Sequence, residues 1–166
     1  MKPPMVPEQQ VPIPTDDELK KLLNTCRGND FEARRDMAIL RMFITTGGRP
    51  AEITNLRYDP AEPEANDIDL DMGQARVVGK GGSDRLLPID PKTVRALNRY
   101  LRARAKHPRA HLPNLWLGKA GIFTADGIRQ MIERRGTRLD SDISMLISSG
   151  THLRMPGWPM GGTRAI

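Results

Sequence analysis

Residues 45–53, with the sequence TTGGRPAEI, constrain the fold most because they require a sharp corner between two helices. An apolar-patterned helix over residues 33–44 runs into this stretch. Two glycines then end it, since glycine tolerates the left-handed φ that follows a helix end. Pro50 suits the first position of a new helix. Arg49 lies at the corner between them, where its fork of donors can be aimed at a phosphate or a carboxylate. The alternative is an ordinary surface arginine.

Composition restricts the kinds of partner and site. The 166 residues carry 26 Lys and Arg against 20 Asp and Glu, a net charge of +6 that favours nucleic acid before a membrane surface. Cys26 is the only cysteine, and the histidines lack metal-ligand spacing: His107, His111 and His152. We therefore expect no metal and no cofactor. No apolar run in residues 1–14 is long enough for a signal peptide or a membrane span, so we expect a cytoplasmic, nucleoid-associated protein.

The N-terminal third predicts a linker and two helices. Residues 1–14 are proline-rich and read as an extended linker. Thr15 and Glu18 form a capping box for a helix that ends near Gly28. Asp30 caps the next helix, whose many apolar positions predict the central buried helix. Its arginines are predicted to face solvent: Arg34, Arg35 and Arg41.

The middle of the chain predicts a three-stranded antiparallel meander over residues 68–70, 75–79 and 85–89. Lys80 lies at the tip of the second hairpin. A phosphate-binding loop is excluded there, because the glycine spacing is wrong and Gly81 stands where Ser or Thr is needed. Two interpretations of Lys80 remain: a solvated turn residue, or a mobile lysine that enters a DNA groove.

Two further helices are predicted after the sheet. Pro91 opens one that runs to about Lys106, with an apolar stripe of Val94, Leu97, Leu101 and Ala105. Another face is entirely basic: Lys92, Arg95, Arg99, Arg102 and Lys106. Solvated helices usually mix signs, so this basic stripe predicts contact with a phosphate backbone, with a plain solvated face as the alternative. Thr124 caps the last helix. Ile128, Met131 and Ile132 are expected inside it, and Arg129, Arg134 and Arg135 outside.

Three segments together resemble the catalytic domain of tyrosine recombinases, the phage-integrase family: TGGRPAEITNL, VVGKGGSDRLLPI and LWLGKAGIFTADGIRQMIERRG. Members carry a T-G-x-R-x-x-E corner and a glycine-flanked lysine on a β-hairpin at about this separation. The resemblance covers residues 11–136. It implies a mixed α/β (α+β) fold, with helices packed around one another and a small three-stranded antiparallel sheet at one edge. It also implies recombination of double-stranded DNA through a 3′-phosphotyrosine intermediate, with other recombinase protomers as partners.

The resemblance assigns roles to three residues. Arg49 is the first catalytic arginine, which grips the scissile phosphate as negative charge gathers in the transition state. Lys80 is the hairpin lysine, which enters the DNA and supplies a proton to the leaving 5′-hydroxyl. Glu52 supports the corner, either by holding the Arg49 side chain or by capping the helix start.

Other family elements are missing, so we expect a fragment truncated at both ends that binds DNA but is catalytically incomplete. Tyr58 and Tyr100 are the only tyrosines, and both lie too early for the nucleophile. Residues 152–154, His-Leu-Arg, lack the spacing of the family's His-x-x-Arg pair. The N-terminal core-binding domain is also absent. The alternatives are a non-catalytic DNA-binding regulator or dominant-negative partner of an intact integrase, and a non-enzymatic helical interaction module.

We divide the chain into a linker (1–14), a partial catalytic domain (15–136) and a tail (137–166) without stable periodicity. The tail is interpreted as disordered or as a frameshifted reading of the missing motif. When residues 142–166 are read from the third base of each codon, Met155-Pro156 must give Ala and Met160-Gly161 must give Gly. The free bases allow a His-x-x-Arg-His run. A gene whose other frame lacks this motif, or reaches a stop first, would reject the frameshift.

Overall fold

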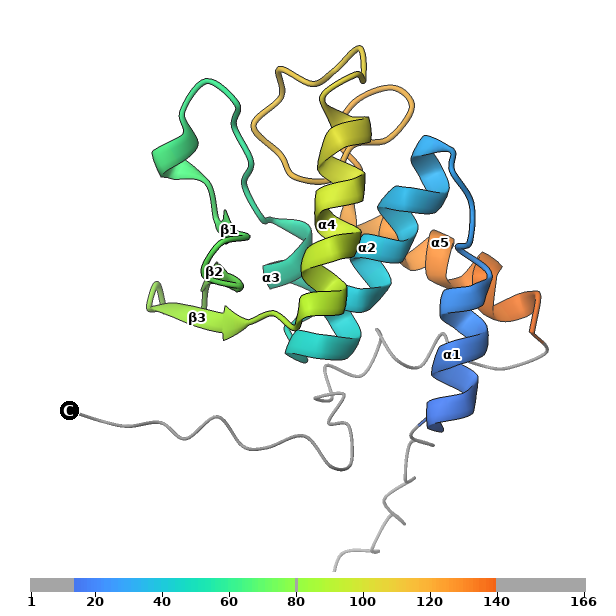
Figure 1. Cartoon of the computed structure of the whole chain (residues 1–166). Coiled ribbons are helices and arrows are strands. Elements are labelled where there is room, and N and C mark those ends of the chain that lie inside the picture. The colour runs from blue at the N-terminus through green and yellow to red at the C-terminus, as the bar shows by residue number, and fades with distance from the viewer. Residues whose placement is uncertain (1–13, 80, 140–166) are drawn as a thin grey trace, which may run out of the picture.

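The computed structural model describes residues 14–79 and 81–139 and confirms a mixed α/β fold (Figure 1). Residues 1–13 of the predicted linker, Lys80 and residues 140–166 of the predicted tail lie outside the described residues. The sheet lies at one edge of the helices, as expected. In chain order the elements are α1 (Asp16–Asn24), α2 (Phe31–Thr46), α3 (Pro50–Thr54), the 3-10 turn η1 (Pro63–Ala65), β1 (Ile68–Asp69), β2 (Gln74–Val78), β3 (Asp84–Pro88), α4 (Pro91–Arg104) and α5 (Ala125–Thr137).

Helix α2 is the central buried helix, as its apolar density predicted. The Asp30 side chain caps its start by accepting from the Ala33 N–H at 3.2 Å. Gly47 ends it in the left-handed region with φ 59°, which a residue with a side chain rarely adopts. At Gly48 the reason for glycine is steric: the Cβ of any other residue would lie 2.7 Å from Cδ1 of Ile53. The predicted corner between α2 and α3 is confirmed.

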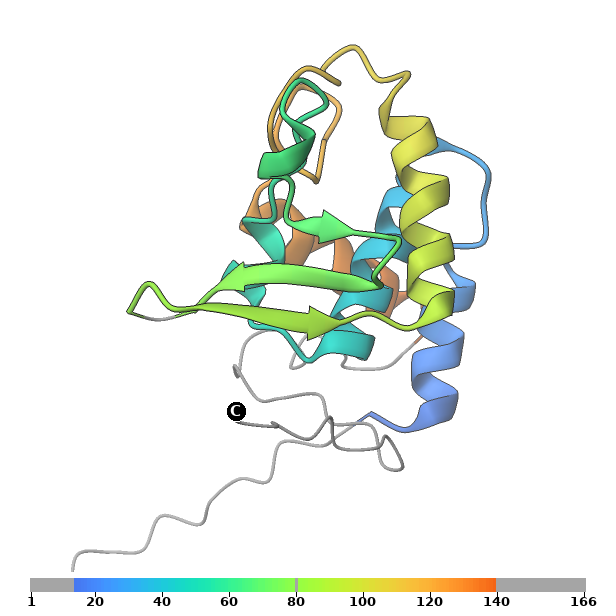
Figure 2. The ribbon, with the colours of Figure 1, turned by 60° about the vertical axis from the view of Figure 1, so that its left-hand side comes forward.

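The three strands form the predicted antiparallel meander in the order β1-β2-β3 (Figure 2). Ala75 of β2 pairs with Ile68 of β1 and Leu87 of β3, and all three side chains are buried against the helices. Arg85 lies opposite Val77 on this inward face, where an apolar residue is usual. The β2–β3 hairpin extends away from the helical body, so the end of β2 and the start of β3 lie at the edge of the molecule.

The prediction that Arg35 and Arg135 face solvent was wrong. Both are paired with the buried Asp36: Nη2 of Arg35 lies 2.8 Å from Oδ1, and Nη2 of Arg135 lies 2.6 Å from Oδ2. Arg135 also donates to the carbonyl oxygen of Thr25 at 2.6 Å, after α1 has ended at Asn24 rather than near Gly28. The pairing allows both arginines to be covered, because each buried charge has a partner.

The apolar stripe predicted for α4 is displaced around the helix. The fully buried positions are Thr93, Ala96, Leu97, Tyr100 and Arg104, whereas Val94 and Leu101 are half-buried and Ala105 is exposed. Arg104 is 1% exposed and donates to five carbonyl oxygens, those of Tyr58, Ala110, Leu112, Asn114 and Leu115. These hydrogen bonds hold the loop after α4 against the helices. They also explain why the charged Arg104 side chain points into the protein. No helix within residues 14–79 and 81–139 is long and apolar enough to span a membrane.

Candidate functional site

Arg49 is presented at the α2–α3 corner with its side chain exposed. Its backbone is in the extended region (φ −68°, ψ 149°) and forms the N-cap of α3. Its N–H donates to Oε2 of Glu52 at 2.8 Å. The guanidinium makes no hydrogen bond or ion pair to any residue that the structure describes. The corner therefore holds the backbone of Arg49 in place and leaves the five donors of its side chain available.

Glu52 braces the corner against the sheet. Its buried carboxylate accepts from the Arg49 N–H and, at 2.7 Å, from Nη2 of Arg85 on β3. Burial raises the pKa of Glu52, but the hydrogen bonds from Arg85 and from the Arg49 backbone outweigh it and hold the pKa below its ordinary value. Glu52 therefore caps the corner and does not hold the Arg49 side chain. Sequence reasoning missed Arg85, although a charged residue at an inward-facing strand position was the available signal.

A cleft of about 360 Å³ opens beside the corner, between α3 and β2. Arg49 and Glu52 lie on one side of it, and Arg76 and Gly79 lie on the other. The N–H of Gly79 donates to the carbonyl oxygen of Ser83 at 2.8 Å and closes the base of the hairpin turn. The fold thus brings the corner and the end of β2 to one cleft. Lys80 follows Gly79 directly but lies outside the described residues, so its role stays a prediction.

The basic stripe of α4 is exposed, as predicted, but it lies apart from this cleft. All five of its residues have exposed side chains: Lys92, Arg95, Arg99, Arg102 and Lys106. The first three line a separate groove of about 670 Å³, and the last two do not. The groove and the Arg49 cleft share no lining residue. Arg49 and the stripe residues that line a pocket therefore border different hollows of the surface.

Neither tyrosine borders the Arg49 cleft. Tyr100 is fully buried, donates its hydroxyl to the Leu115 carbonyl oxygen at 2.8 Å and accepts from the Leu117 N–H at 3.0 Å. Burial raises the pKa of Tyr100 to about 12. The ring of Tyr58 lies under the Arg104 guanidinium, 5.0 Å from its centroid. Within the described ranges, no three His, Cys, Asp or Glu side chains are grouped as metal ligands.

Comparison with known sequences decides the family. The profile of the phage integrase family matches residues 14–139, most of the chain. The chain belongs to the phage integrase family. It is 35% identical over 148 residues to tyrosine recombinase XerC of Pseudomonas putida, covering 88% of this chain and 44% of that relative. It is 34% identical over 133 residues to XerC of Azotobacter vinelandii, covering 79% and 42%.

Solved structures show the same tyrosine recombinase fold. The XerA recombinase superposes with a TM-score of 0.67 at 25% identity, over 87% of this chain and 50% of that one. XerH, solved in a post-cleavage complex with a palindromic difH substrate, superposes with a TM-score of 0.61 at 19% identity, over 80% and 38%. This integrase-family chain thus spans half or less of the length of these relatives.

Because Glu52 is paired with Arg85, we expect the free energy of unfolding of this chain to depend on pH. Because the folded-state pKa of Glu52 is lowered, its contribution is present above the unfolded-state pKa and is lost as the pH falls through the folded-state pKa. We expect Glu52→Gln to lower the free energy of unfolding near neutral pH and to converge with the wild type in acid. Urea titrations between pH 7 and pH 3 measure this. A difference that stays constant down to pH 3 would contradict the ion pair as its source.

Proposed function

We propose that this chain is a DNA-binding fragment of a site-specific tyrosine recombinase that carries the first half of the catalytic set. The observation that carries the proposal is the Arg49 guanidinium, exposed at a braced corner and without an acceptor among the described residues. Its partner would be a phosphate of double-stranded DNA, in the cytoplasm and its nucleoid. The DNA-bound state of the XerH neighbour supports this choice of partner.

The position of Arg49 at the α2–α3 corner suits catalysis of phosphoryl transfer. A guanidinium at the corner donates to the non-bridging oxygens of a scissile phosphate and stabilises the charge that builds up in the transition state. The end of β2 borders the same cleft, which supports the assignment of Lys80 as the donor of a proton to the leaving 5′-hydroxyl. Glu52 acts as a positioning residue, because it fixes the Arg49 backbone and touches no reacting atom.

We expect the 166-residue polypeptide alone to form no covalent adduct with DNA. A nucleophile must reach the scissile phosphate, but Tyr100 is buried with both hydroxyl hydrogen-bonding directions occupied, and Tyr58 packs on Arg104. Nicked suicide substrates, followed by denaturing gels and peptide mapping, measure trapping. An adduct at Tyr58 or Tyr100 would overturn the assignment of this chain as catalytically incomplete.

We expect weak, sequence-tolerant binding to duplex DNA that falls steeply with salt, as counterion release requires. Reversing three stripe residues, Arg95→Glu, Arg99→Glu and Arg102→Glu, should weaken binding equally on every sequence. Fluorescence anisotropy at several salt concentrations tests this, with Arg129→Glu on α5, already paired with Asp126 and Glu133, as a reference reversal. Unchanged binding in the triple variant would make the stripe a solvated face.

The fragment also suits a regulatory role. A folded domain with an exposed Arg49 but no available tyrosine would occupy a recombination site without cutting it. In that case it acts as a non-catalytic regulator or as a dominant-negative partner beside intact recombinase protomers. The frameshifted interpretation of the tail belongs to the same proposal, and reading the gene past codon 136 tests it. A chain that bound no DNA would instead support a helical interaction module.

A further inference from the structure

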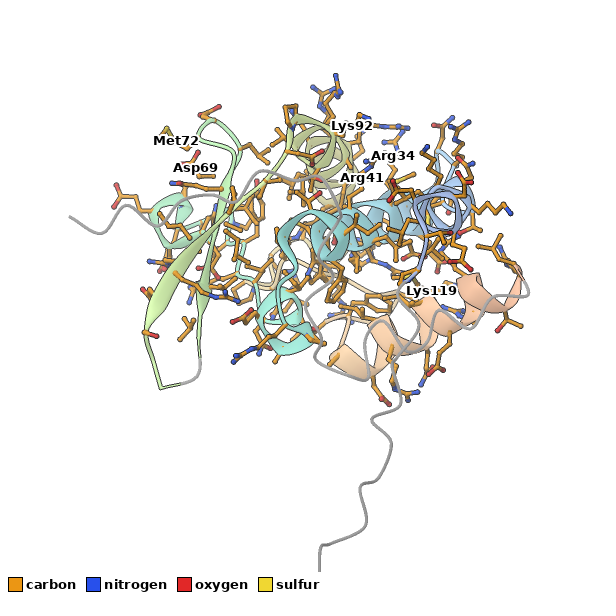
Figure 3. The ribbon with its side chains drawn as sticks, turned by 90° about the horizontal axis from the view of Figure 1, so that it is seen from below. Arg34, Arg41, Asp69, Met72, Lys92 and Lys119 are labelled. Atoms are coloured by element: carbon orange, nitrogen blue, oxygen red, sulfur yellow. The ribbon has the colours of Figure 1, made fainter. Side chains whose placement is uncertain are left out.

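The groove beside α4 gathers cations that sequence reasoning did not group. Its lining residues come from α2, α4 and the turn after α1, and they include the apolar Met37 and Ala96. Six basic side chains line it: Arg27, Arg34, Arg41, Lys92, Arg95 and Arg99. No acidic residue lines it. Figure 3 shows Arg34, Arg41 and Lys92 together on one side of α2, whereas α3 and α5 lie on its other side.

Five of the six cations form two rows, one on α2 and one on α4, and Arg27 lies on the turn after α1. Arg34 and Arg41 are seven residues apart on α2, as are Lys92 and Arg99 on α4, so each row is about 10 Å long at 1.5 Å per residue. Thr45, near the end of α2, donates to Asp90 at 3.1 Å and contacts the Thr93 hydroxyl at 2.8 Å, at the start of α4. The helices therefore run antiparallel. Arg41 faces the Lys92 end of the groove and Arg34 the Arg99 end.

These cations have few partners in the protein. None of the six forms an ion pair within residues 14–79 and 81–139, and Arg99 has only a 3.3 Å hydrogen bond to Asn29. Nε of Arg34 is buried without an acceptor among the described residues. Asp90, at one end of the groove, is occupied by capping the Thr93 N–H at 2.9 Å. Asp90 lies near Arg41 but does not line the groove, so the six like charges along it repel one another, and an anionic ligand would relieve that repulsion.

We propose that this groove binds one sugar–phosphate strand of nucleic acid, as a second site distinct from the Arg49 cleft. Each strand of a duplex carries one charge per about 3.4 Å of helix axis, so a 10 Å track spans about three phosphates. Five of the six cations are arginines, whose planar fork matches a phosphate. No aromatic side chain lines the groove, so it contacts the backbone without stacking bases and is tolerant of sequence.

The inference rests on the proposed function only in taking nucleic acid as the partner. Cations on two antiparallel helices line one groove without an acidic residue between them, which suits the continuous charge of a phosphodiester backbone better than the irregular charge of an acidic peptide. Because the groove and the cleft share no residue, one domain can contact two nucleic-acid segments at once. The ligand chemistry is a phosphodiester strand, and single-stranded and duplex DNA are its two sources.

A matched pair of triple variants in the full chain tests the groove. The groove variant is Arg34→Gln, Arg95→Gln and Arg99→Gln. The control is Arg109→Gln, Arg134→Gln and Arg138→Gln, which removes the same charge from exposed positions outside both the groove and the α4 stripe. Anisotropy with a labelled 12-nucleotide oligo-dT should show roughly thirtyfold weaker binding for the groove variant, about threefold per lost contact, and its log–log salt slope should fall by about two. The control should lose less than threefold.

The other possible outcomes test the groove, the class of its ligand and the proposed function. Equal loss in both triples would overturn the groove and show that the oligonucleotide responds to net charge alone. If the wild type binds duplex DNA but not the oligonucleotide, duplex DNA is the source, and the groove triple must then weaken duplex binding more than the control does, or the groove is overturned. Binding to neither would overturn the proposed function itself. Tighter binding of a 12-residue poly-glutamate would assign the groove to acidic peptides. If the groove triple fails to fold, Lys92→Gln with Arg95→Gln, both exposed, should weaken oligonucleotide binding roughly tenfold.

Discussion

Replacing Asp36 by alanine is expected to lower the free energy of unfolding by about 3–5 kcal/mol, the usual cost of removing one partner from a buried ion pair. Asp36 is 3% exposed and is the only acid bonded to Arg35 and Arg135 among the described residues. Its loss leaves two covered guanidinium groups without a carboxylate. The stacking of Arg35 on Phe123, 3.8 Å from the ring centroid, replaces little of that interaction. Urea unfolding followed by circular dichroism measures the change.

The matched control for Asp36→Ala is Glu133→Ala. Glu133 also binds an arginine, Arg129, at 2.8 Å, but both side chains are more than 40% exposed. Exposed pairs contribute roughly 0–1 kcal/mol, so this variant should unfold nearly as the wild type does. An equal loss of stability in both variants would contradict this prediction. The Asp36 ion pairs would then not join α2 to α5 as the structure indicates.

Alanine at the arginine matching Arg49, in an intact recombinase of this family, should slow strand cleavage about a hundredfold or more, the usual cost of losing a transition-state anion donor. The Arg49 backbone is held by Glu52, and its guanidinium has no hydrogen-bond or ion-pair partner among the described residues. The effect should therefore fall on the cleavage rate more than on DNA affinity. Single-turnover cleavage of a nicked suicide substrate gives the rate, and anisotropy on the uncleaved duplex gives the affinity.

Lysine at the same corner is the informative control, because it keeps the charge but loses the planar fork. A rate between those of the arginine and alanine enzymes would show that bidentate geometry contributes. Equal losses of rate and affinity in the alanine variant would contradict a transition-state role and make Arg49 a general phosphate contact. In the present chain, Arg49→Ala should leave groove binding of oligo-dT within a factor of about two, because the cleft and the groove share no residue.

Local signals predicted most of the elements. The Thr15 capping box, the Asp30 cap, the two glycines before Arg49 and the Thr124 cap all lie where the chain pattern placed them. Caps and turns depend on residues within four positions of one another, so they can be read without knowing the fold. The family assignment followed from three such local patterns in the right order, and the matching family profile confirms it.

The burial of particular polar side chains was not predictable in this way. Arg35, Arg104 and Arg135 look like surface residues in sequence, because arginine is usually exposed. Each is covered because the fold brings acceptors to it: the Leu117 carbonyl joins the neighbouring Asp36 at Arg35, and Asp36 accepts from Arg135 across 99 residues. Five loop carbonyls, one of them from Tyr58, accept from Arg104. The displacement of the α4 apolar stripe has the same cause.

The sequence alone therefore determined the helix starts, the hairpin order, the Arg49 corner and the family, since each depends on short-range stereochemistry or on a motif. Only the tertiary structure decided which charges share a space. It separated the Arg49 cleft from the α4 stripe, paired Glu52 with Arg85 across 33 residues, and joined Arg34 and Arg41 to Lys92, Arg95 and Arg99 in one groove. Such groupings arise from the packing of α2 against α4, a long-range arrangement that no local pattern in the chain encodes.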